Sequence, residues 1–392
     1  MKIGILLSRV PYPLEKGDKL RAYHQIKALA KNHEIYLCAL NVGKVHPKAV
    51  EELSKYCKEI EVIQLTRIGI LINLLYSLMF SKLPLQVAYF YNRRAKKKIH
   101  AFFLTHQIDH LYCQLIRVSE YVKDFNAVPK TLDYMDALSR GMERRINQSK
   151  LGMRTLFKIE STRLKRYEHF IFKAFDHCTI ISEQDRDLIV HAENDKIKII
   201  RNGVDQDYFK PKTIDKKYDL VFTGNMSYPP NVDGVSYLVN EILPLVWKTN
   251  PEITLAIVGA NPSPKVERLA GKNVLVTGWV DDITDYYAAS HIFIAPMQIG
   301  TGLQNKLLEA MAMKIPCITS PLANNALGGT HLVNIMIGEE SETYAQYILE
   351  LLSNKSLAQT LVDNAYQLIS ERYTWEGSTK ELEELFLNPN NS

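Results

Sequence analysis

The sequence predicts an α/β protein of two domains, each built on a parallel β-sheet with helices on both faces. Short continuous apolar runs alternate with amphipathic stretches, which is typical of buried parallel strands between helices. This pattern occurs twice, on either side of the polar stretch 205–219. The length of 392 residues also fits two domains of roughly 100–200 residues each.

The apolar runs that predict strands form two groups. The first group is KIGILL (2–7), EIYLCAL (34–40), IEVIQL (60–65), HLYCQL (110–115), CTIIS (178–182) and IKII (197–200). The second group is YDLVFTG (218–224), ITLAIVG (253–259), NVLVTG (273–278), IFIAP (292–296) and CITS (317–320). We therefore expect an N-terminal domain over residues 1–205 and a C-terminal domain over 206–374.

Composition and charge exclude several classes of protein. A net charge of +5 is too small for a dedicated nucleic-acid binder, so we expect no nucleic-acid partner. The odd number of cysteines and the lack of a C-x-x-C argue against a disulfide framework or a zinc site. These residues are Cys38, Cys57, Cys113, Cys178 and Cys317. The apolar run 3–7 is too short for a signal peptide, and the run 68–80 is too short to span a membrane. The predicted location is the cytoplasm.

The segment 295–321 is the most informative about function. A strand is followed by a loop containing Gly300 and Gly302, and a helix is expected from about Leu303 to Met313. Glycines let a backbone approach a ligand closely. The free N–H groups and the positive dipole end of a helix bind anions. The segment therefore predicts an anion site at the start of this helix.

Two charged side chains of this helix, Lys306 and Glu309, lie three residues apart and share a face. A rise of ~1.5 Å per residue places Glu309 ~10 Å beyond Gly302, about the distance from a diphosphate to its ribose. A carboxylate can accept two hydrogen bonds from a ribose diol, while Lys306 can neutralise a phosphate. The alternative is an ordinary amphipathic helix whose Lys306 and Glu309 face solvent.

The pattern G-x-G-L-Q-N-K-x-L-E-A-M-A followed by M-K-I-P-C-I-T-S is similar to the donor-site segment of the family 4 glycosyltransferases, which have the GT-B fold. Further segments resemble that family in the expected order: 13–21, 201–205, 222–226, 257–259, 276–280 and 373–375. The resemblance implies two Rossmann-like domains with parallel sheets facing across a cleft. It also implies a final helix, at about 375–387, that packs back on the N-terminal domain.

The function that this resemblance implies is sugar transfer from a nucleotide-diphosphate sugar to a glycan or a lipid-linked acceptor. The reaction would retain the anomeric configuration and need neither a metal nor a cofactor. The most similar members are transferases of bacterial exopolysaccharide and envelope-glycan clusters. Two alternatives remain: a nucleotide-sugar epimerase of the same architecture, and a non-catalytic sugar-nucleotide-binding subunit.

The resemblance assigns Lys306 and Glu309 to catalysis. The residues that it assigns to donor binding are Gly17, Asn202, Gly203, Gly224, Asn225, Gly278, Val280, Gly300, Thr301, Gly302, Leu303, Gln304 and Asn305. The sequence departs from the family where Thr301 replaces the first of two glutamates. It also lacks the arginine and lysine that often follow the first strand of the C-terminal domain. Lys306 and the helix start would then supply the positive charge, together with Lys16, Lys19 or Arg21.

The acceptor side is marked by residues 131–139, which predict a strand ending in a polar loop. Asp136 could orient the acceptor hydroxyl, or it could cap the next helix. Two D-x-D matches, at 185–187 and 205–207, lie in a polar helical stretch and in the linker, and we expect neither to bind a metal.

A possible membrane contact lies within residues 68–104. An apolar run is followed there by aromatic residues and then by Arg93, Arg94 and Lys96 to Lys98. Aromatic residues beside a basic cluster suit the interface of an anionic membrane, which would bring the enzyme to the inner face of the membrane and to a lipid-linked acceptor. The alternative is a buried helix followed by a solvated basic helix.

Overall fold

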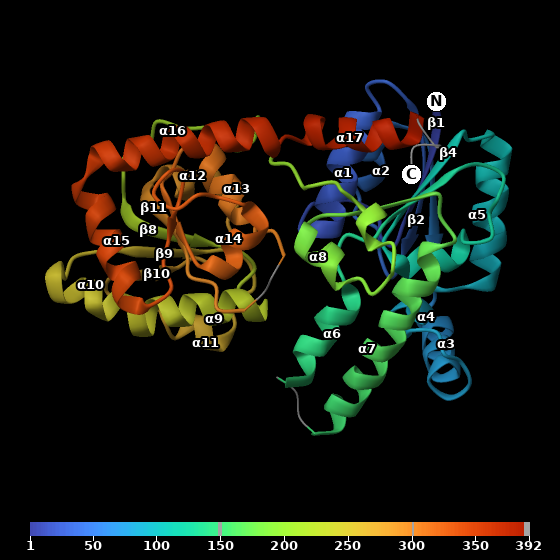
Figure 1. The fold of residues 1–392 in the computed structure, drawn as a ribbon, viewed down its shortest axis with the longest axis horizontal. Helices are drawn as coiled ribbons and strands as arrows, with labels where there is room; N and C mark the ends of the chain where they lie inside the picture. The colour runs from blue at the N-terminus through green and yellow to red at the C-terminus, as the bar shows by residue number, and fades with distance from the viewer. Residues whose placement is uncertain (148–150, 300–301, 388–392) are drawn as a thin grey trace. The chain divides into compact units, whose positions relative to one another are not determined.

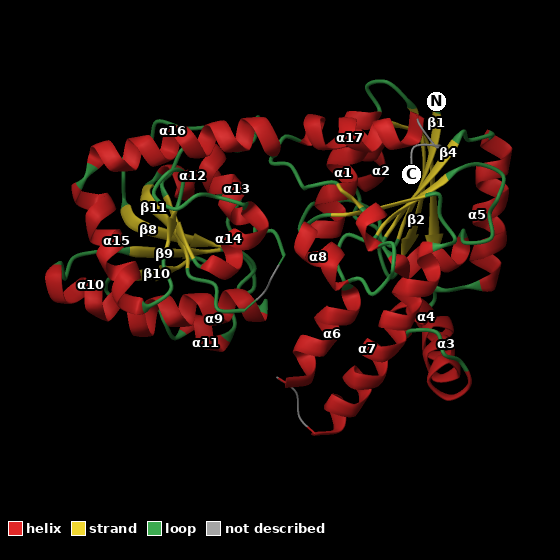
Figure 2. Cartoon of the chain, in the orientation of Figure 1, coloured by secondary structure: helices red, strands yellow, loops and turns green. Residues whose placement is uncertain are grey.

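The computed structural model describes residues 1–147, 151–299 and 302–387. The chain forms two compact units (Figure 1). The N-terminal unit comprises Met1–Arg201 and the segment from Ser378 onward, and the C-terminal unit comprises Asn202–Gly377. Each unit contains a wholly parallel sheet with helices on both of its faces (Figure 2), so the predicted fold class is confirmed.

The sheet of the N-terminal unit has the strand order β3-β2-β1-β4-β5-β6-β7. Its strands are β1 (Lys2–Leu7), β2 (Glu34–Asn41), β3 (Cys57–Gln64), β4 (His110–Gln114), β5 (Lys130–Asp133), β6 (His177–Ile180) and β7 (Lys198–Ile199). Its helices are α1 (Gly17–Leu29), α2 (Ala49–Leu53), α3 (Arg67–Phe80), α4 (Leu85–Phe90), α5 (Arg93–His106), η1 (Ile116–Tyr121), α6 (Leu138–Asn147), α7 (Leu151–Phe172), α8 (Glu183–Leu188) and η2 (Asn194–Lys196). The predicted strand at 60–65 therefore begins three residues earlier, at Cys57.

The sheet of the C-terminal unit has the order β10-β9-β8-β11-β12-β13. Its strands are β8 (Tyr218–Thr223), β9 (Leu255–Val258), β10 (Val274–Val276), β11 (Ser290–Ala295), β12 (Cys317–Thr319) and β13 (Met336–Ile337). Its helices are α9 (Pro229–Tyr237), η3 (Leu238–Ile242), α10 (Leu243–Thr249), α11 (Pro264–Glu267), α12 (Thr284–Ala288), α13 (Asn305–Ala312), α14 (Pro321–Leu327), α15 (Ser341–Ser353) and α16 (Lys355–Arg372). The two-residue strand β13 was not predicted, because so short a run has no period.

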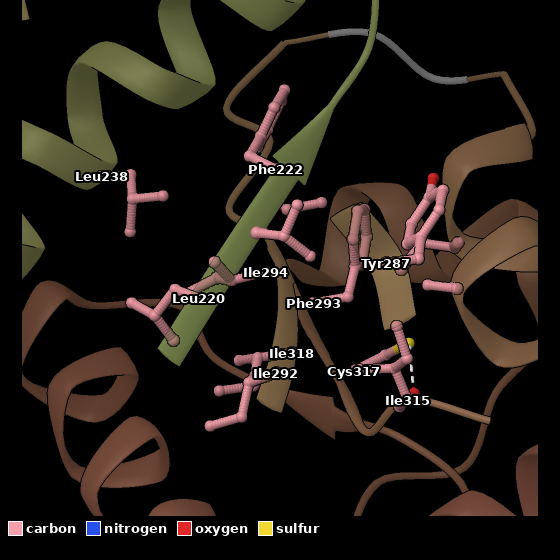
Figure 3. Close-up of a cluster of buried hydrophobic side chains, with 14 of the residues drawn as sticks. Leu220, Phe222, Leu238, Tyr287, Ile292, Phe293, Ile294, Ile315, Cys317 and Ile318 are labelled. Atoms are coloured by element: carbon pink, nitrogen blue, oxygen red, sulfur yellow. Dashed lines mark hydrogen bonds between the residues drawn. The ribbon is translucent and has the colours of Figure 1, made fainter. Parts of the chain in front are cut away.

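The core of the C-terminal unit lies between this sheet and its helices. Figure 3 shows Phe222 of β8, Tyr287 of α12 and Phe293 of β11 among aliphatic side chains from neighbouring strands. All three aromatic side chains are fully buried. Cys317 belongs to the same core, and all five cysteines are buried and free.

The last helix, α17 (Trp375–Leu387), ends on the N-terminal unit. Glu383 accepts a hydrogen bond from the His33 ring at 2.7 Å. The Phe386 ring stacks on His110 of β4, with 4.3 Å between the ring centroids. Within the described part of the chain, no helix is both long enough and apolar enough to cross a bilayer.

Candidate functional site

The carboxyl ends of β8, β9 and β10 meet at one edge of the C-terminal sheet, and three glycines join them there. Gly224 (φ 147°) and Gly259 (φ 142°) adopt a backbone conformation that side chains disfavour. A Cβ atom on Gly259 would lie 1.9 Å from the Gly224 carbonyl oxygen. The Gly259 amide donates to the Gly278 carbonyl at 3.2 Å. Gly224 and Gly259 therefore have no room for a side chain, whereas a Cβ on Gly278 (φ 71°) would meet no atom within 4 Å. Open α/β sheets bind their ligands at this edge.

Lys306 of α13 is almost buried at this edge, with 8% of its surface exposed. Its ammonium donates to the Asn231 side-chain oxygen and lies 4.4 Å from the centroid of the Phe222 ring. Burial lowers the pKa of Lys306 to about 7, and the charge of Glu309 opposes this shift in part. The alternative in which Lys306 faces solvent is therefore wrong. The structure holds instead a nearly buried cation whose hydrogen-bond partner Asn231 is a neutral amide.

Glu309 lies one turn further along α13 and is held by a short chain of hydroxyl groups. The Tyr287 hydroxyl donates to its carboxylate at 2.8 Å and lies 2.6 Å from the Thr223 hydroxyl. Burial raises the pKa of Glu309, whereas the Tyr287 hydrogen bond and the charge of Lys306 act in the opposite direction. The carboxylate is therefore fixed in orientation before any ligand arrives.

The start of α13 differs from its prediction. The helix begins at Asn305 rather than near Leu303, with Gln304 as its N-cap residue. The Gln304 side chain donates to the Gly302 carbonyl at 2.8 Å, and the Asn202 amide donates to the Asn305 side chain at 3.5 Å. The structure thus brings two of the predicted donor residues, Asn202 and Asn305, together. The predicted residues Gly300 and Thr301 lie outside the described residues.

Other predicted donor residues have clear local structural roles. A Cβ on Gly203 would lie 2.3 Å from the Trp375 backbone nitrogen, so the close packing of these segments requires a glycine. Val280 and Leu303 pack against the core of the unit, and the Asn225 side chain accepts from the Ser227 amide at 3.0 Å. Their contact with a donor stays a prediction.

In the N-terminal unit, Gly17 is the first residue of α1, and a Cβ there would meet no atom within 4 Å. Arg21 of the same helix is fully buried, and its guanidinium donates to Asp133 at 2.6 Å. The Asp133 carboxylate also accepts from the Tyr112 hydroxyl at 2.7 Å. The suggestion that Arg21 supplies charge to a donor phosphate is therefore wrong, because its charge is used inside the domain core.

Asp136 follows β5 in a strained turn. The preceding Met135 has a φ of 61°, which is rare for a bulky residue. The Asp136 side chain reaches solvent, but protein surrounds its carboxyl at longer range. This partial desolvation, together with repulsion from Asp185, raises the pKa of Asp136 to about 7. The Ser139 amide at the start of α6 donates to Glu168 at 2.9 Å, so Glu168 takes the position expected of a cap. Capping by Asp136 is therefore not supported, and its acceptor role stays a prediction.

Three side chains at these edges were not predicted from the sequence. Asn231 and Tyr287 hold Lys306 and Glu309, and the charge of Arg117, which follows β4, lowers the pKa of Asp136 in part. The Arg117 guanidinium donates to the Gln86 side-chain oxygen at 2.9 and 3.2 Å. Asn231 and Tyr287 lie on helices whose residue spacing does not distinguish them from other positions. Arg117 could have been predicted as a site residue, because it comes just after a strand.

Among residues 1–147, 151–299 and 302–387, no three His, Cys, Asp or Glu side chains gather closely enough to hold an ion. Asp185 of the first D-x-D match accepts instead from the Ser182 hydroxyl at 2.6 Å. Asp205 of the second accepts from the amides of Asp207 and Tyr208.

Comparison with known proteins gives matches to both units. Residues 217–354 match the family model described as glycosyl transferases group 1. The chain is 25% identical to an uncharacterized 44.6 kDa protein in the cps region of Klebsiella pneumoniae, over 95% of this chain and 96% of that protein. It is also 25% identical to the Escherichia coli UDP-Gal:alpha-D-GlcNAc-diphosphoundecaprenol alpha-1,3-galactosyltransferase, over 43% of this chain and 50% of that enzyme.

The fold has solved counterparts. The crystal structure of Anabaena Alr3699/HepE in complex with UDP superposes with a TM-score of 0.69 at 15% identity, covering 99% of this chain and all of that one. The chain therefore has the two-domain GT-B fold. The matched domain and the names of its relatives further support a glycosyltransferase.

Proposed function

We propose that this protein is a family 4 glycosyltransferase that moves a sugar, as a hexosyltransferase, from a nucleotide-diphosphate sugar to a surface-glycan precursor, with retention and without a metal. The observation that carries the proposal is the pair formed by Lys306 and Glu309 at the glycine-rich edge of the C-terminal sheet. One side chain is a nearly buried cation and the other an oriented carboxylate. A nucleoside diphosphate offers the complementary groups, namely phosphate charge and a ribose diol.

The proposed chemistry rests on stabilising the departing diphosphate. As the glycosidic bond to phosphate breaks, negative charge develops on the phosphate oxygens, and preorganised positive groups lower the energy of that transition state. Lys306 supplies a cation in a poorly solvated place, where its electrostatic effect is strong. Backbone amides at the start of α13 add to it. Glu309 holds the ribose, and Asp136 orients the acceptor hydroxyl.

For the acceptor we propose a glycan or lipid-linked precursor of a bacterial surface polysaccharide, used at the inner face of the membrane. Two relatives support this choice through their names: one lies in a cps region, and the other acts on a diphosphoundecaprenol-linked sugar. For the donor nucleotide, UDP is the first candidate, because Alr3699/HepE was crystallised with it.

The first test is a thermal-shift series with UDP, GDP, ADP and their sugars. A ligand that binds only the folded state raises the melting temperature, so one nucleotide series should give a clear shift. Binding at a hundred times the dissociation constant contributes about 2.7 kcal/mol of stability. Product analysis with the best donor then distinguishes the reactions. Transfer requires added membrane extract, whereas an epimerase converts the donor alone. Absence of any shift across the series would contradict the donor site.

Donor binding should also depend on pH through Lys306. With a pKa of about 7, Lys306 is protonated below neutral pH and loses its charge above it. A bound diphosphate favours the protonated form, so binding takes up a proton above pH 7. The dissociation constant should then rise about tenfold between pH 6 and pH 8. Titration calorimetry of an intact nucleotide sugar, repeated in buffers of different ionisation enthalpy, measures this proton uptake. A flat profile would show that Lys306 does not face the phosphates.

A further inference from the structure

Helix α3 (Arg67–Phe80) turns its apolar side chains toward solvent. Eight of its large apolar residues are between 45% and 74% exposed: Ile68, Leu71, Ile72, Leu75, Tyr76, Leu78, Met79 and Phe80. A surface helix of a globular domain normally shows the opposite arrangement, with its apolar side inward. So dense a group of exposed apolar residues marks an interaction surface.

The side of α3 that faces the protein carries its polar side chains. The Asn73 amide donates to the Tyr91 carbonyl, and the buried Ser77 hydroxyl donates to the Leu83 carbonyl at 2.7 Å. Together with the buried Ile70, these residues recur every three or four positions and so form one face of the helix. Helix α3 is thus held to the domain by hydrogen bonds and by Ile70 and Leu74, while most of its large apolar side chains face away from the domain.

The helix is firmly attached to the domain. Arg163 of α7 donates to the carbonyls of Ser77 and Leu83, at 3.0 and 3.4 Å, and so satisfies groups at the negative end of α3. Glu160, one turn earlier on α7, accepts from the amides of Leu85 and Gln86 at 2.7 and 2.9 Å. In Figure 1, α3 lies beyond α4 at one end of the N-terminal unit, away from the sheet. The apolar face is therefore presented on a rigid support.

The sequence segment that contains α3 is positively charged. Residues 62–108 contain no aspartate or glutamate and seven basic residues: Arg67, Lys82, Arg93, Arg94, Lys96, Lys97 and Lys98. Because the whole chain has a net charge of +5, the remainder carries −2. Arg67 and Lys82 flank α3 on either side. Tyr91, which accepts the Asn73 hydrogen bond, lies two residues before the start of α5, so the basic first turns of α5 begin beside α3.

We infer that α3 inserts its apolar face into the surface of an anionic lipid bilayer, with the flanking basic residues at the headgroups. The helix is about 21 Å long, shorter than the ~30 Å hydrocarbon core, so it lies in the interface rather than across it. Apolar burial and attraction to anionic lipids reinforce each other in such helices. A second copy of the chain fits less well, because a twofold contact would bring like charges together. The inference goes beyond the transfer reaction and needs no assignment of donor or acceptor.

Vesicle sedimentation of the full chain tests this inference. Wild-type protein should partition onto vesicles of equal phosphatidylcholine and phosphatidylglycerol, and much less onto phosphatidylcholine alone. Leu75→Glu replaces an apolar contact by a negative charge and should weaken partitioning about tenfold or more. The matched control is Leu387→Glu on α17. Leu387 is also a helical leucine of the N-terminal unit and is 53% exposed, against 52% for Leu75. This control should bind as the wild type does.

A second measurement reports the position of the helix itself. Tyr76→Trp places an indole on the exposed face of α3, and its emission should shift to shorter wavelength when anionic vesicles are added. Equal binding of wild type and Leu75→Glu, or an unshifted indole, would overturn the inference. So would a lipid-free wild-type dimer that Leu75→Glu converts to a monomer, because α3 would then be a self-association surface.

Discussion

Replacing Lys306 by methionine should reduce sugar transfer about a hundredfold or more while the protein stays folded. Methionine keeps much of the length and apolar stem of the side chain, so it can still pack beside Phe222 and Met297. What it removes is the one charge that we assign to the departing diphosphate. Release of nucleoside diphosphate from the best donor, with membrane extract supplying the acceptor, measures the loss.

The matched control is Lys314→Met. Lys314 follows the same helix and also lies over an aromatic ring, 4.4 Å from the centroid of Tyr366, but it is exposed and away from the glycine-rich edge. Its replacement should leave transfer within about twofold of the wild type. If Lys306→Met retained near-wild-type turnover, the proposed phosphate site would be wrong.

Stability should change in the opposite direction to activity. Burial lowers the pKa of Lys306 from its ordinary value of 10.5 to about 7, so between these values the unfolded chain binds more protons than the folded one. The free energy of unfolding therefore rises with pH across this range, and the cost of burying the charge is greatest below pH 7. Lys306→Met removes that cost. Its melting temperature should exceed that of the wild type by more at pH 6 than at pH 9.

Part of the site could be predicted from local sequence spacing, and part of it could not. The spacing of Lys306 and Glu309 correctly placed them on one helix beyond a strand, because helical periodicity is a local property. It predicted a solvent-exposed or ligand-facing lysine, however, and the structure holds a nearly buried one. The burial arises from Phe222 of β8 and Asn231 of α9, and Asn231 lies 75 residues before Lys306. Such long-range packing leaves no trace in local spacing.

For the fold, too, local patterns could be predicted and long-range contacts could not. Continuous apolar runs predicted ten of the longer parallel strands near their observed bounds, since a strand buried on both faces must be apolar throughout. For helix α3 the sequence left two alternatives open, a membrane contact and a buried helix. Its apolar run fits a buried helix equally well, and only the hydrogen bonds of Asn73 and Ser77 show which side faces the protein. The expectation that Arg21 supplies charge to a donor phosphate was wrong. Arg21 lies near a glycine loop in the sequence, but its guanidinium is paired with Asp133 in the core.

Replacing Glu309 by alanine should lower kcat/KM for the donor at least about tenfold, mainly by weakening the hold on the nucleotide. The carboxylate accepts one hydrogen bond from Tyr287 and keeps further acceptor capacity for a ribose diol. Loss of even one ribose hydrogen bond to a charged group, worth about 1.5–3 kcal/mol, would account for such a change. The comparison of a nucleotide sugar with its 2′-deoxyribose analogue measures it directly. Wild type should prefer the ribose form, and Glu309→Ala should not.

Tyr287→Phe separates orientation from contact at the same carboxylate. Phenylalanine preserves the packing against Phe293 and Phe209 but removes the hydroxyl that joins Thr223 to Glu309. Glu309 keeps its charge and gains rotational freedom, so binding should weaken less than in Glu309→Ala, and the preference for ribose should survive in reduced form. A Tyr287→Phe variant as impaired as Glu309→Ala would mean that Glu309 serves the core rather than the nucleotide. An unchanged ribose preference in Glu309→Ala would lead to the same conclusion.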